Sequence, residues 1–439
     1  MRPMSVSERL HSIREVLQLL FKGDAKFFTD RQTIMGKSIL DRSSSARQGS
    51  AGRADANTRA DLLVSVYGDD SGELIQDIQS KVEALYGHSI RKTVANALAE
   101  FNFTSGRVEV NDRGALPFVI RARLETALRR AGFKGDGLVR RIRGKRPSTK
   151  RDRLRRSRLY LPGNEPKFMI NAGLHRPDAI ILDLEDSVHP LEKDAARLVV
   201  RNALAEVDFM GAERMVRINQ LPLGFEDLDV IVPESPDLIL LPKIESASEV
   251  KQVHRRIAKI QKAAEQEKTI WLMPILESAL GIENAFGIAS ATETVVALAM
   301  GLEDYTADLG VRKTLEGQES LYARMRLVNA ARAAGVQAND SVFSDVGDIA
   351  GLSASAHRSR GMGFEGMGCI HPRQIEPIHE AFAPTSNEIE RARKICDAFE
   401  KAESKGLSVV SLGSRMIDPP VVLRARQLVE NARKAGLIH

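Results

Sequence analysis

Acidic side chains end several apolar runs in the second half of this 439-residue chain. Glu277 lies at the end of the run WLMPILES, and Asp304 lies in GLEDY, directly after the next apolar run. Two carboxylates, completed by water and substrate oxygens, are how proteins usually hold Mg²⁺. If the two runs are neighbouring strands of a barrel, their ends converge and both carboxylates can reach one ion. We therefore expect a Mg²⁺ site; the alternative is that each acid is solvated or caps a helix.

A second group combines one arginine with three acids. Arg217 lies in the apolar segment MVRINQ, where a guanidinium needs an anion, either a substrate oxygen or an acid of a neighbouring strand. Asp183, Glu185 and Asp186 end the segment ILDLED, where their mutual repulsion requires a cation. Asp183 and Glu185 share one face of a strand, while Asp186 faces away unless the chain has turned. We expect one of these acids to act as a base or to hold metal-bound water, although Asp186 or Ser187 can also cap the following helix.

Two further cations and one histidine stand beside the predicted strands. Lys243 in LLPKIES and Arg156 in RRSRLYLPG are suited to binding a phosphate or a thioester carbonyl, although a single cation is more often a solvated surface charge. His371 precedes a proline in CIHPRQ, which favours an extended or turn conformation. A histidine there is more often a structural hydrogen-bonding group than a base. We expect Lys243 and Arg156 to bind substrate.

An alternation of apolar strands and amphipathic helices must position these side chains. Eight strand patterns, most of them separated by helical ones such as EKDAARLVVRNALAEV, are typical of a (β/α)8 TIM barrel, whose sites lie at the C-terminal ends of the strands. A doubly wound open sheet is the alternative, but its glycine-rich phosphate loop is missing after the first strand. We predict an α/β fold with a TIM barrel over 156–400. The predicted strands are SRLYLPG, DAIILDLED, RMVRINQ, DLILLPKIES, TIWLMPILES, VVALAMGLEDY, SVFSDV and GMGCIHPRQ.

The rest of the chain divides into four parts. Residues 1–50 begin with a helical pattern and end in a loop rich in Ser, Gly and Arg. Residues 51–133 form a small α+β domain with strands DLLVSVYG and RVEVND and helices IQDIQSKVEALYG, IRKTVANALAEF and VIRARLETALRRAG. Residues 134–155 form a basic linker, and 401–439 form a segment that follows the barrel.

Charge and composition argue against several classes of function. The net charge of +6 comes from residues 134–158, which include twelve Lys or Arg and two Asp. A nucleic-acid-binding arm is the alternative to a solvated linker, but no aromatic residues are interleaved for base stacking. No apolar run is long enough to span a bilayer, and the first residues lack a signal-peptide pattern. The two cysteines fit a reducing compartment, so we expect a cytoplasmic protein without membrane or nucleic-acid partners.

The segments around these residues resemble the citrate lyase beta-subunit and malyl-CoA lyase family of the HpcH/HpaI aldolase superfamily. The resemblance implies that Glu277 and Asp304 bind Mg²⁺ and that Arg217 contacts the keto acid and the developing oxyanion. It also implies that the Arg156 region and residues 183–186 line the site. The matching pieces are RSRLYLPGNEPKFM, DAIILDLEDSVHPLEKDAAR, VRINQ, LLPKIES, PILESALGI, GLEDYTADLG, YARMRLVNAARAAG and CIHPRQIE.

The family's chemistry is a retro-Claisen cleavage of a carboxylated 3-hydroxyacyl-CoA to acetyl-CoA and a keto acid. The resemblance leaves citryl-CoA, citramalyl-CoA and malyl-CoA open as substrates, with Asp186 as the candidate base. Two alternatives are a malyl-CoA-type thioesterase on the same site and a non-catalytic scaffold subunit. One departure from the family is that Met367 and Gly368 stand where a lysine usually precedes CIHP. The resemblance also implies a homo-oligomer, a trimer or hexamer, and a C-terminal segment that covers a site.

Residues 51–133 resemble the citrate lyase gamma subunit, a small acyl carrier, most clearly at VNDRGAL and IRARLE. That carrier holds its prosthetic arm on a serine two residues before the aspartate that opens its first strand. Here the aspartate is Asp61, so Arg59 stands at the attachment position. We therefore expect no covalent prosthetic group and free CoA thioesters as substrates.

Overall fold

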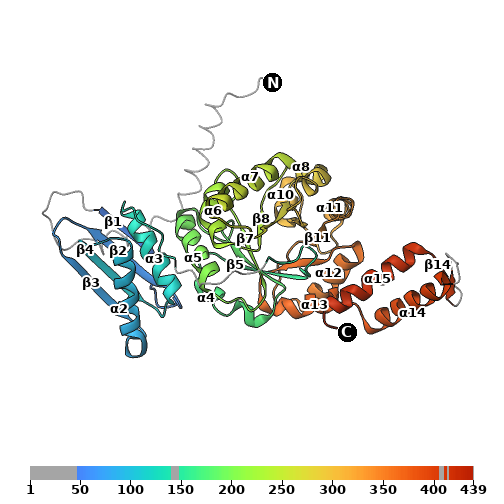
Figure 1. Cartoon of the computed structure of the whole chain (residues 1–439), viewed down its shortest axis with the longest axis horizontal. Helices are drawn as coiled ribbons and strands as arrows, with labels where there is room; N and C mark the ends of the chain where they lie inside the picture. Colours follow the sequence, from blue (N-terminus) through green and yellow to red (C-terminus); the bar gives the residue numbers. More distant parts are fainter. Residues whose placement is uncertain (1–46, 140–147, 405–409, 413–414, 439) are drawn as a thin grey trace, which may run out of the picture. The chain divides into compact units, whose positions relative to one another are not determined.

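The computed structural model describes residues 47–139, 148–404, 410–412 and 415–438 (Figure 1). From Arg47 onward these residues belong to one compact unit, with a four-stranded sheet, a closed eight-stranded barrel and a two-stranded sheet. The predicted extension lies outside the described residues as far as residue 46, and so does the centre of the basic linker, 140–147. No helix in the described ranges is long and apolar enough to cross a membrane.

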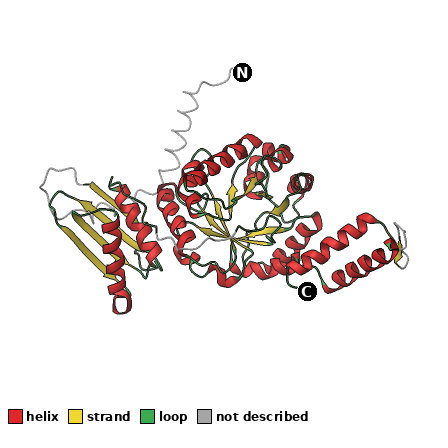
Figure 2. Cartoon of the chain, viewed as in Figure 1, coloured by secondary structure: helices red, strands yellow, loops and turns green. Residues whose placement is uncertain are grey.

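The first domain is a four-stranded sheet with two helices (Figure 2). The strand order is β1-β2-β4-β3, in which β3 runs parallel to β4 and the other pairs are antiparallel. Buried and more exposed residues alternate along β2 and β4, so one face of the sheet packs against the helices. The elements are β1 (Arg47–Gly52), β2 (Leu62–Gly68), β3 (Leu74–Ser80), α2 (Glu83–Glu100), β4 (Gly106–Asp112) and α3 (Pro117–Arg130).

Two strands of this sheet differ from the sequence predictions. The segment IQDIQS, predicted as helix, forms β3, because the four-residue spacing of its partly buried Leu74 and Ile78 fits one face of a strand as well as one face of a helix. The segment from Arg47, predicted as loop, forms β1. A Cβ on Gly49 would lie 2.2 Å from the Ala127 carbonyl oxygen of α3. Glycine is therefore required at position 49 because β1 packs closely against α3 there.

The second domain is the predicted TIM barrel, and its closed ring of parallel strands excludes the open-sheet alternative. Inward-facing apolar residues such as Ile181, Met215 and Leu240 fill the interior. The strands are β5 (Ser157–Pro162), β6 (Ala179–Asp183), β7 (Glu213–Arg217), β8 (Leu238–Leu241), β9 (Trp271–Leu276), β10 (Ala297–Met300), β11 (Gln337–Asp340) and β12 (Gly366–Cys369).

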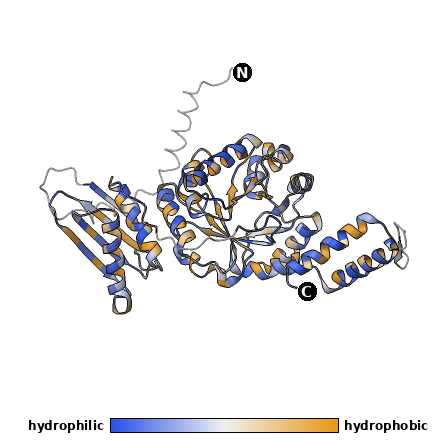
Figure 3. Ribbon diagram, viewed as in Figure 1, coloured by the Kyte–Doolittle hydropathy of each residue, from blue (hydrophilic) through white to orange (hydrophobic). Residues whose placement is uncertain are grey.

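Amphipathic helices surround this barrel, and their orange and blue residues alternate in Figure 3. In α7, for example, Val250, Val253 and Ile257 are buried, and a capping box between Ser246 and Glu249 fixes the start of the helix. The helices are α4 (Pro166–Met169), α5 (Lys193–Glu206), α6 (Gly224–Ile231), α7 (Ala247–Ala263), α8 (Ala279–Glu283), α9 (Ala285–Ala289), α10 (Leu302–Asp308), α11 (Leu321–Ala333), α12 (Ile349–Met362) and α13 (Ile375–Phe382).

One barrel strand lies earlier in the sequence than predicted. The segment SVFSDV, predicted as a strand, is a loop, and β11 is the preceding QAND. The sequence did not predict β11 as a strand because its residues are mostly polar, and a buried aspartate is uncommon in a strand unless it is paired. Asp340 is paired here: it forms an ion pair with Arg324 and accepts a hydrogen bond from Ser359 Oγ at 2.6 Å.

After the barrel, the helices α14 (Ser386–Glu403) and α15 (Pro419–Lys434) pack together, with Ala392, Ala425 and Val429 buried in their contact. Strands β13 (Val410–Leu412) and β14 (Arg415–Ile417) pair between them. The predicted role of this region as a cover over a site stays a prediction.

Candidate functional site

A cavity of ≈ 440 Å³ opens at the C-terminal ends of the barrel strands. Asp183, Asp186 and Arg217 line it from β6, β7 and the loop after β6, while Glu277 and Asp304 line it from beyond β9 and β10. Strand ends carry the functional residues of TIM barrels. The predicted metal ligands and the predicted arginine therefore lie in one cavity.

Arg217 is the centre of the charged cluster. It is the register partner of Asp183 on the neighbouring strand, and its Nε and Nη2 donate to Asp183 at 2.7 and 2.8 Å. Its Nη1 lies 2.8 Å from Glu185 and 3.3 Å from Asp186. The sequence left open whether Arg217 pairs with a substrate oxygen or with an acid of a neighbouring strand. In the structure its partners are acids at the end of the neighbouring strand β6.

These contacts set the protonation of the pair. Burial opposes ionisation of Asp183, but the hydrogen bonds and charge of Arg217 outweigh it and hold the pKa of Asp183 below its usual range. Burial also opposes the charge on Arg217, yet the same partner raises the pKa of the guanidinium. The Tyr160 ring lies with its centroid 5.2 Å from the guanidinium carbon. Asp183 and Tyr160 thus fix the position of the arginine.

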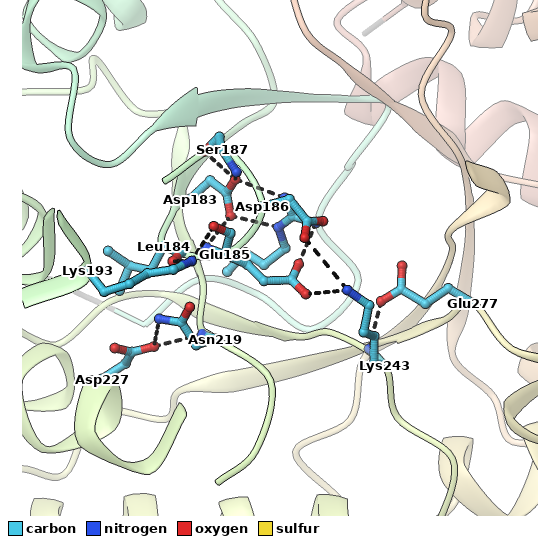
Figure 4. Close-up of polar contacts among 11 residues, drawn as sticks. Asp183, Leu184, Glu185, Asp186, Ser187, Lys193, Asn219, Asp227, Lys243 and Glu277 are labelled. Carbon is cyan, nitrogen blue, oxygen red and sulfur yellow. Dashed lines mark hydrogen bonds and ion pairs between the residues drawn. The ribbon is translucent and has the colours of Figure 1, made fainter. Parts of the chain in front are cut away.

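Lys243 connects the two sides of the site (Figure 4). Its Nζ lies 3.0 Å from Glu185, 3.6 Å from Asp186 and 3.7 Å from Asp304. Its backbone N–H donates to Glu277 Oε1 at 2.7 Å. The lysine therefore lies among the predicted acids, not on the open surface.

Two of the acids have strongly raised pKa values. Burial, together with repulsion from Glu185 and Asp304, raises the pKa of Glu277 to about 8. Burial and repulsion from Asp186 raise the pKa of Glu185 to about 7, against the opposing effect of Arg217. Near neutral pH Glu277 is therefore mostly protonated and Glu185 about half protonated, and an added positive charge would displace these protons.

The donor set fits a divalent cation of the Mg²⁺ type. Four carboxylates (Asp183, Glu185, Asp186 and Asp304) form ion pairs with Arg217 or Lys243, and a fifth, Glu277, accepts only from the Lys243 backbone N–H. A Cβ at Gly301 would lie 2.3 Å from Glu277 Oε2, so only glycine leaves room for this carboxylate. Among the described residues no group of three or more His, Cys, Asp or Glu is arranged to hold a metal. Two carboxylates completed by water and substrate oxygens match the preference of Mg²⁺.

The structure does not bring Arg156, which the sequence predicts to bind substrate, to the cavity. Arg156 precedes β5 and lies at the N-terminal end of the barrel, opposite the cavity. Its Nε and Nη2 donate to Asp178 at 2.8 and 2.9 Å. The expectation rested on the cation alone, although Arg156 stands directly before the predicted strand SRLYLPG and therefore at its N-terminal end. His371, in contrast, accepts a hydrogen bond from the Arg373 N–H at 3.1 Å, as a structural residue does.

Three residues of the site were not assigned to it from the sequence, where Ser187 is named only as a helix-cap candidate. Ser187 donates to Asp183 through its hydroxyl, Gly301 makes room for Glu277, and Arg158 lines the cavity from β5. The alternation of Arg158 with Tyr160 along the strand is a signal that would have placed Arg158 on the inward face. No local pattern marks Gly301, whose requirement comes from the neighbouring strand.

Two family models match the chain. The model described as HpcH/HpaI aldolase/citrate lyase matches residues 156–372. An acyl-carrier model described as the malonate decarboxylase delta subunit (MdcD) matches residues 54–131. The two matches correspond to the barrel and to the four-stranded domain, so both resemblances seen in the sequence are confirmed.

Individual relatives match about two thirds of the chain. The citrate lyase subunit beta of Escherichia coli K12 is 39% identical over 291 residues, which cover 66% of this chain and 96% of that protein. The human mitochondrial citramalyl-CoA lyase is 32% identical over 287 residues, covering 63% and 84%. The crystal structure of the protein CitE from Mycobacterium tuberculosis, in complex with magnesium, acetoacetate and coenzyme A, superposes with a TM-score of 0.54 at 28% identity. It covers 65% of this chain and 100% of that chain.

Proposed function

Since the chain belongs to the HpcH/HpaI aldolase/citrate lyase family and is a carbon–carbon lyase, we propose that it cleaves a carboxylated 3-hydroxyacyl-CoA into acetyl-CoA and a keto acid. Mg²⁺ held by Glu277 and Asp304 is the proposed cofactor. The CitE structure in complex with magnesium and coenzyme A supports both the ion and the thioester.

The observation that carries this proposal is the excess of carboxylates around Arg217 and Lys243. Burying acids without enough cations is costly, and the raised pKa of Glu277, about 8, reports that cost. A bound divalent cation would offset this cost because its charge compensates the buried carboxylates. The chelating oxygens of a 3-hydroxy acid or keto acid complete the coordination that two carboxylates leave open.

The proposed reaction breaks the bond between the carbinol carbon and the thioester α-carbon. A base takes the hydroxyl proton, and the electron pair of the broken bond stays on the α-carbon. The resulting thioester enolate takes up a proton to give acetyl-CoA, and the carbinol carbon becomes the carbonyl of the keto acid. When bound, Mg²⁺ supplies Lewis-acid polarisation of the keto-acid oxygens.

The residues of the chain have distinct proposed roles. Arg217 neutralises charge that develops on the substrate oxygens, and Asp183 orients its guanidinium. Asp186 lines the cavity beside Arg217 and is the proposed base. Lys243 lies within 3.0 Å of Glu185 and 3.6 Å of Asp186, and its proposed role is to hold both acids beside the cavity.

The experiment that tests this function is mass-spectrometric product analysis of the full chain with citryl-CoA, citramalyl-CoA and malyl-CoA. Mg²⁺-dependent formation of acetyl-CoA and a keto acid, abolished by a chelator, is the expected result. Free CoA together with the intact hydroxy acid would instead identify a thioesterase. Asp186→Asn should lower kcat on the order of a hundredfold with a much smaller change in KM.

We further propose that the carrier-like domain holds no covalent arm. Arg59 is exposed at the expected attachment position, and the neighbouring Thr58 hydroxyl is engaged with Asp55 at 2.8 Å. Asp61 is buried and binds Arg123 through two hydrogen bonds of 3.0 and 2.8 Å. The intact mass of the purified protein should equal the mass of the polypeptide, and an added phosphopantetheine-type mass would contradict the proposal.

A further inference from the structure

Arg158 is a buried cation without a carboxylate partner. It is 1% exposed, and no acid in the described part of the chain forms an ion pair with it. Its Nη2 donates to the Asp340 carbonyl oxygen at 2.7 Å, its Nη1 contacts the Met273 sulfur at 3.4 Å, and its Nε has no partner. Burial lowers the pKa of Arg158, although an arginine stays charged.

Other buried arginines of the chain are paired. Arg155 binds Glu213 at 2.7 Å, Arg123 binds Asp61 at 2.8 Å, and Arg324 binds Asp340. A buried charge is tolerated when it is neutralised nearby. No acid in the described chain neutralises the charge of Arg158. We therefore expect an anionic ligand to bind it.

The surroundings of Arg158 open towards the functional cavity. Arg158 lines that cavity together with Tyr160 and Pro162, the other inward-facing residues of β5. Its register partner on β12 is Gly368, which has no side chain to cover it. The carboxylate of Asp340 belongs to Arg324 and Ser359, so Asp340 offers only its carbonyl oxygen. A ligand that reaches deeper than Arg217 therefore meets an unpaired guanidinium.

We propose that Arg158 binds a second carboxylate of the acyl group and makes the site selective for a hydroxyacyl thioester that releases a dicarboxylic keto acid. This inference rests on the proposed lyase function. Among citryl-CoA, citramalyl-CoA and malyl-CoA, only the citryl group carries a carboxylate beyond the one next to its hydroxyl-bearing carbon. Arg217, the other arginine that lines the cavity, is already shared by three acids.

The test compares binding of oxaloacetate and pyruvate, which differ by one carboxylate, to the full chain with Mg²⁺ by calorimetry. Wild-type protein should bind oxaloacetate about tenfold tighter or more, as expected for a charge-assisted pair. Arg158→Met should remove most of that preference and leave the affinity for pyruvate within about twofold. Arg158→Lys, which keeps a cation, should restore part of the preference. Arg156→Met, at a position two residues earlier that precedes β5 and lies outside the cavity, should change neither affinity.

Several outcomes would overturn the inference. One is that wild-type protein binds oxaloacetate no tighter than pyruvate. Another is that Arg158→Met and Arg158→Lys keep the wild-type preference for oxaloacetate. The third is that variants with an unchanged thermal unfolding transition lose affinity for both ligands equally. The lyase assay separates this result from the proposed function. If thioesters are cleaved while the preference is independent of Arg158, only the inference fails. If the Arg158-dependent preference is present but no thioester is cleaved, the carboxylate site remains and the proposed function fails.

Discussion

The two ends of the barrel carry similar charged residues in opposite states of pairing. At the N-terminal end, Arg155 and Glu213 form a fully buried pair at 2.7 Å, and Glu213 also accepts from the Thr149 hydroxyl at 2.7 Å. Asp237 at the same end contacts both Arg214 and Lys268. At the C-terminal end, four carboxylates share Arg217 and Lys243, and Glu277 beside them has no cation of its own in the described chain.

The pKa values of buried acids at the two ends reflect this difference in ion pairing. Burial opposes ionisation of Asp237, but Arg214 and Lys268 outweigh it and lower its pKa. For Glu277 at the other end, burial prevails and raises its pKa to about 8. The barrel strands thus begin at a neutralised cluster and end at a cluster in which carboxylates outnumber cations. Pairing, not residue type, distinguishes the structural end from the functional one.

The largest effect should come from removing a proposed metal ligand. Glu277→Gln or Asp304→Asn should lower kcat/KM for the thioester on the order of a thousandfold, since each removes one of the two carboxylates proposed to hold Mg²⁺. Steady-state kinetics across a range of Mg²⁺ concentrations measures this. Glu303→Gln is the matched control, because Glu303 binds Lys313 and Ser344 instead. Equal losses in Glu303→Gln and Asp304→Asn would contradict the assignment.

At the opposite end, Arg155→Met should affect stability instead of chemistry. It leaves Glu213 as a buried carboxylate without its guanidinium, which should cost about 3–5 kcal/mol of unfolding free energy. Urea unfolding followed by circular dichroism measures the change. The double variant Arg155→Met, Glu213→Leu should recover most of the loss, because no unpaired charge remains. A large drop in kcat of the folded variant would show that the N-terminal end of the barrel also affects catalysis at the C-terminal end.

The acidic cluster should also make stability depend on pH. The pKa of Glu277 is raised to about 8 in the folded state, so the folded protein holds a proton that the unfolded chain loses above its ordinary carboxyl pKa. The free energy of unfolding without Mg²⁺ should therefore fall between about pH 5 and pH 8, by up to about 1.4 kcal/mol per pH unit. Urea unfolding at several pH values measures this slope. Glu277→Gln should flatten it, and an unchanged slope in that variant would assign it to other groups.

The smallest effect is expected at Arg156. Its pair with Asp178 is partly exposed, with side chains 17% and 13% accessible, so Arg156→Met should cost only about 1 kcal/mol. Activity should stay at the wild-type level, since Arg156 lies at the end of β5 opposite the cavity. Kinetics and thermal unfolding of one preparation measure both quantities. A raised KM for the thioester would restore the substrate-binding role that the sequence suggested.

Much of this site could be predicted from the sequence because it depends on strand ends. Glu277, Asp304 and Arg217 follow or end apolar runs, and a closed parallel barrel brings such positions together. Requirements that arise between strands could not be predicted. Gly301 is needed because of the Glu277 side chain, and β11 is hidden because Asp340 is paired with Arg324 from a helix. For Arg156, the expectation rested on residue type, although its position before the strand already puts it at the N-terminal end.

The most direct test of the acidic cluster is the proton balance of Mg²⁺ binding. Calorimetric titrations at pH 7 in buffers of different ionisation enthalpy report how many protons leave the protein. Because the pKa of Glu277 is about 8 and that of Glu185 is about 7, binding should release more than one proton from wild-type protein and about one proton fewer from Glu277→Gln. A binding enthalpy that is independent of the buffer, or equal proton release in both proteins, would contradict the claim that Glu277 is held ready for a divalent cation.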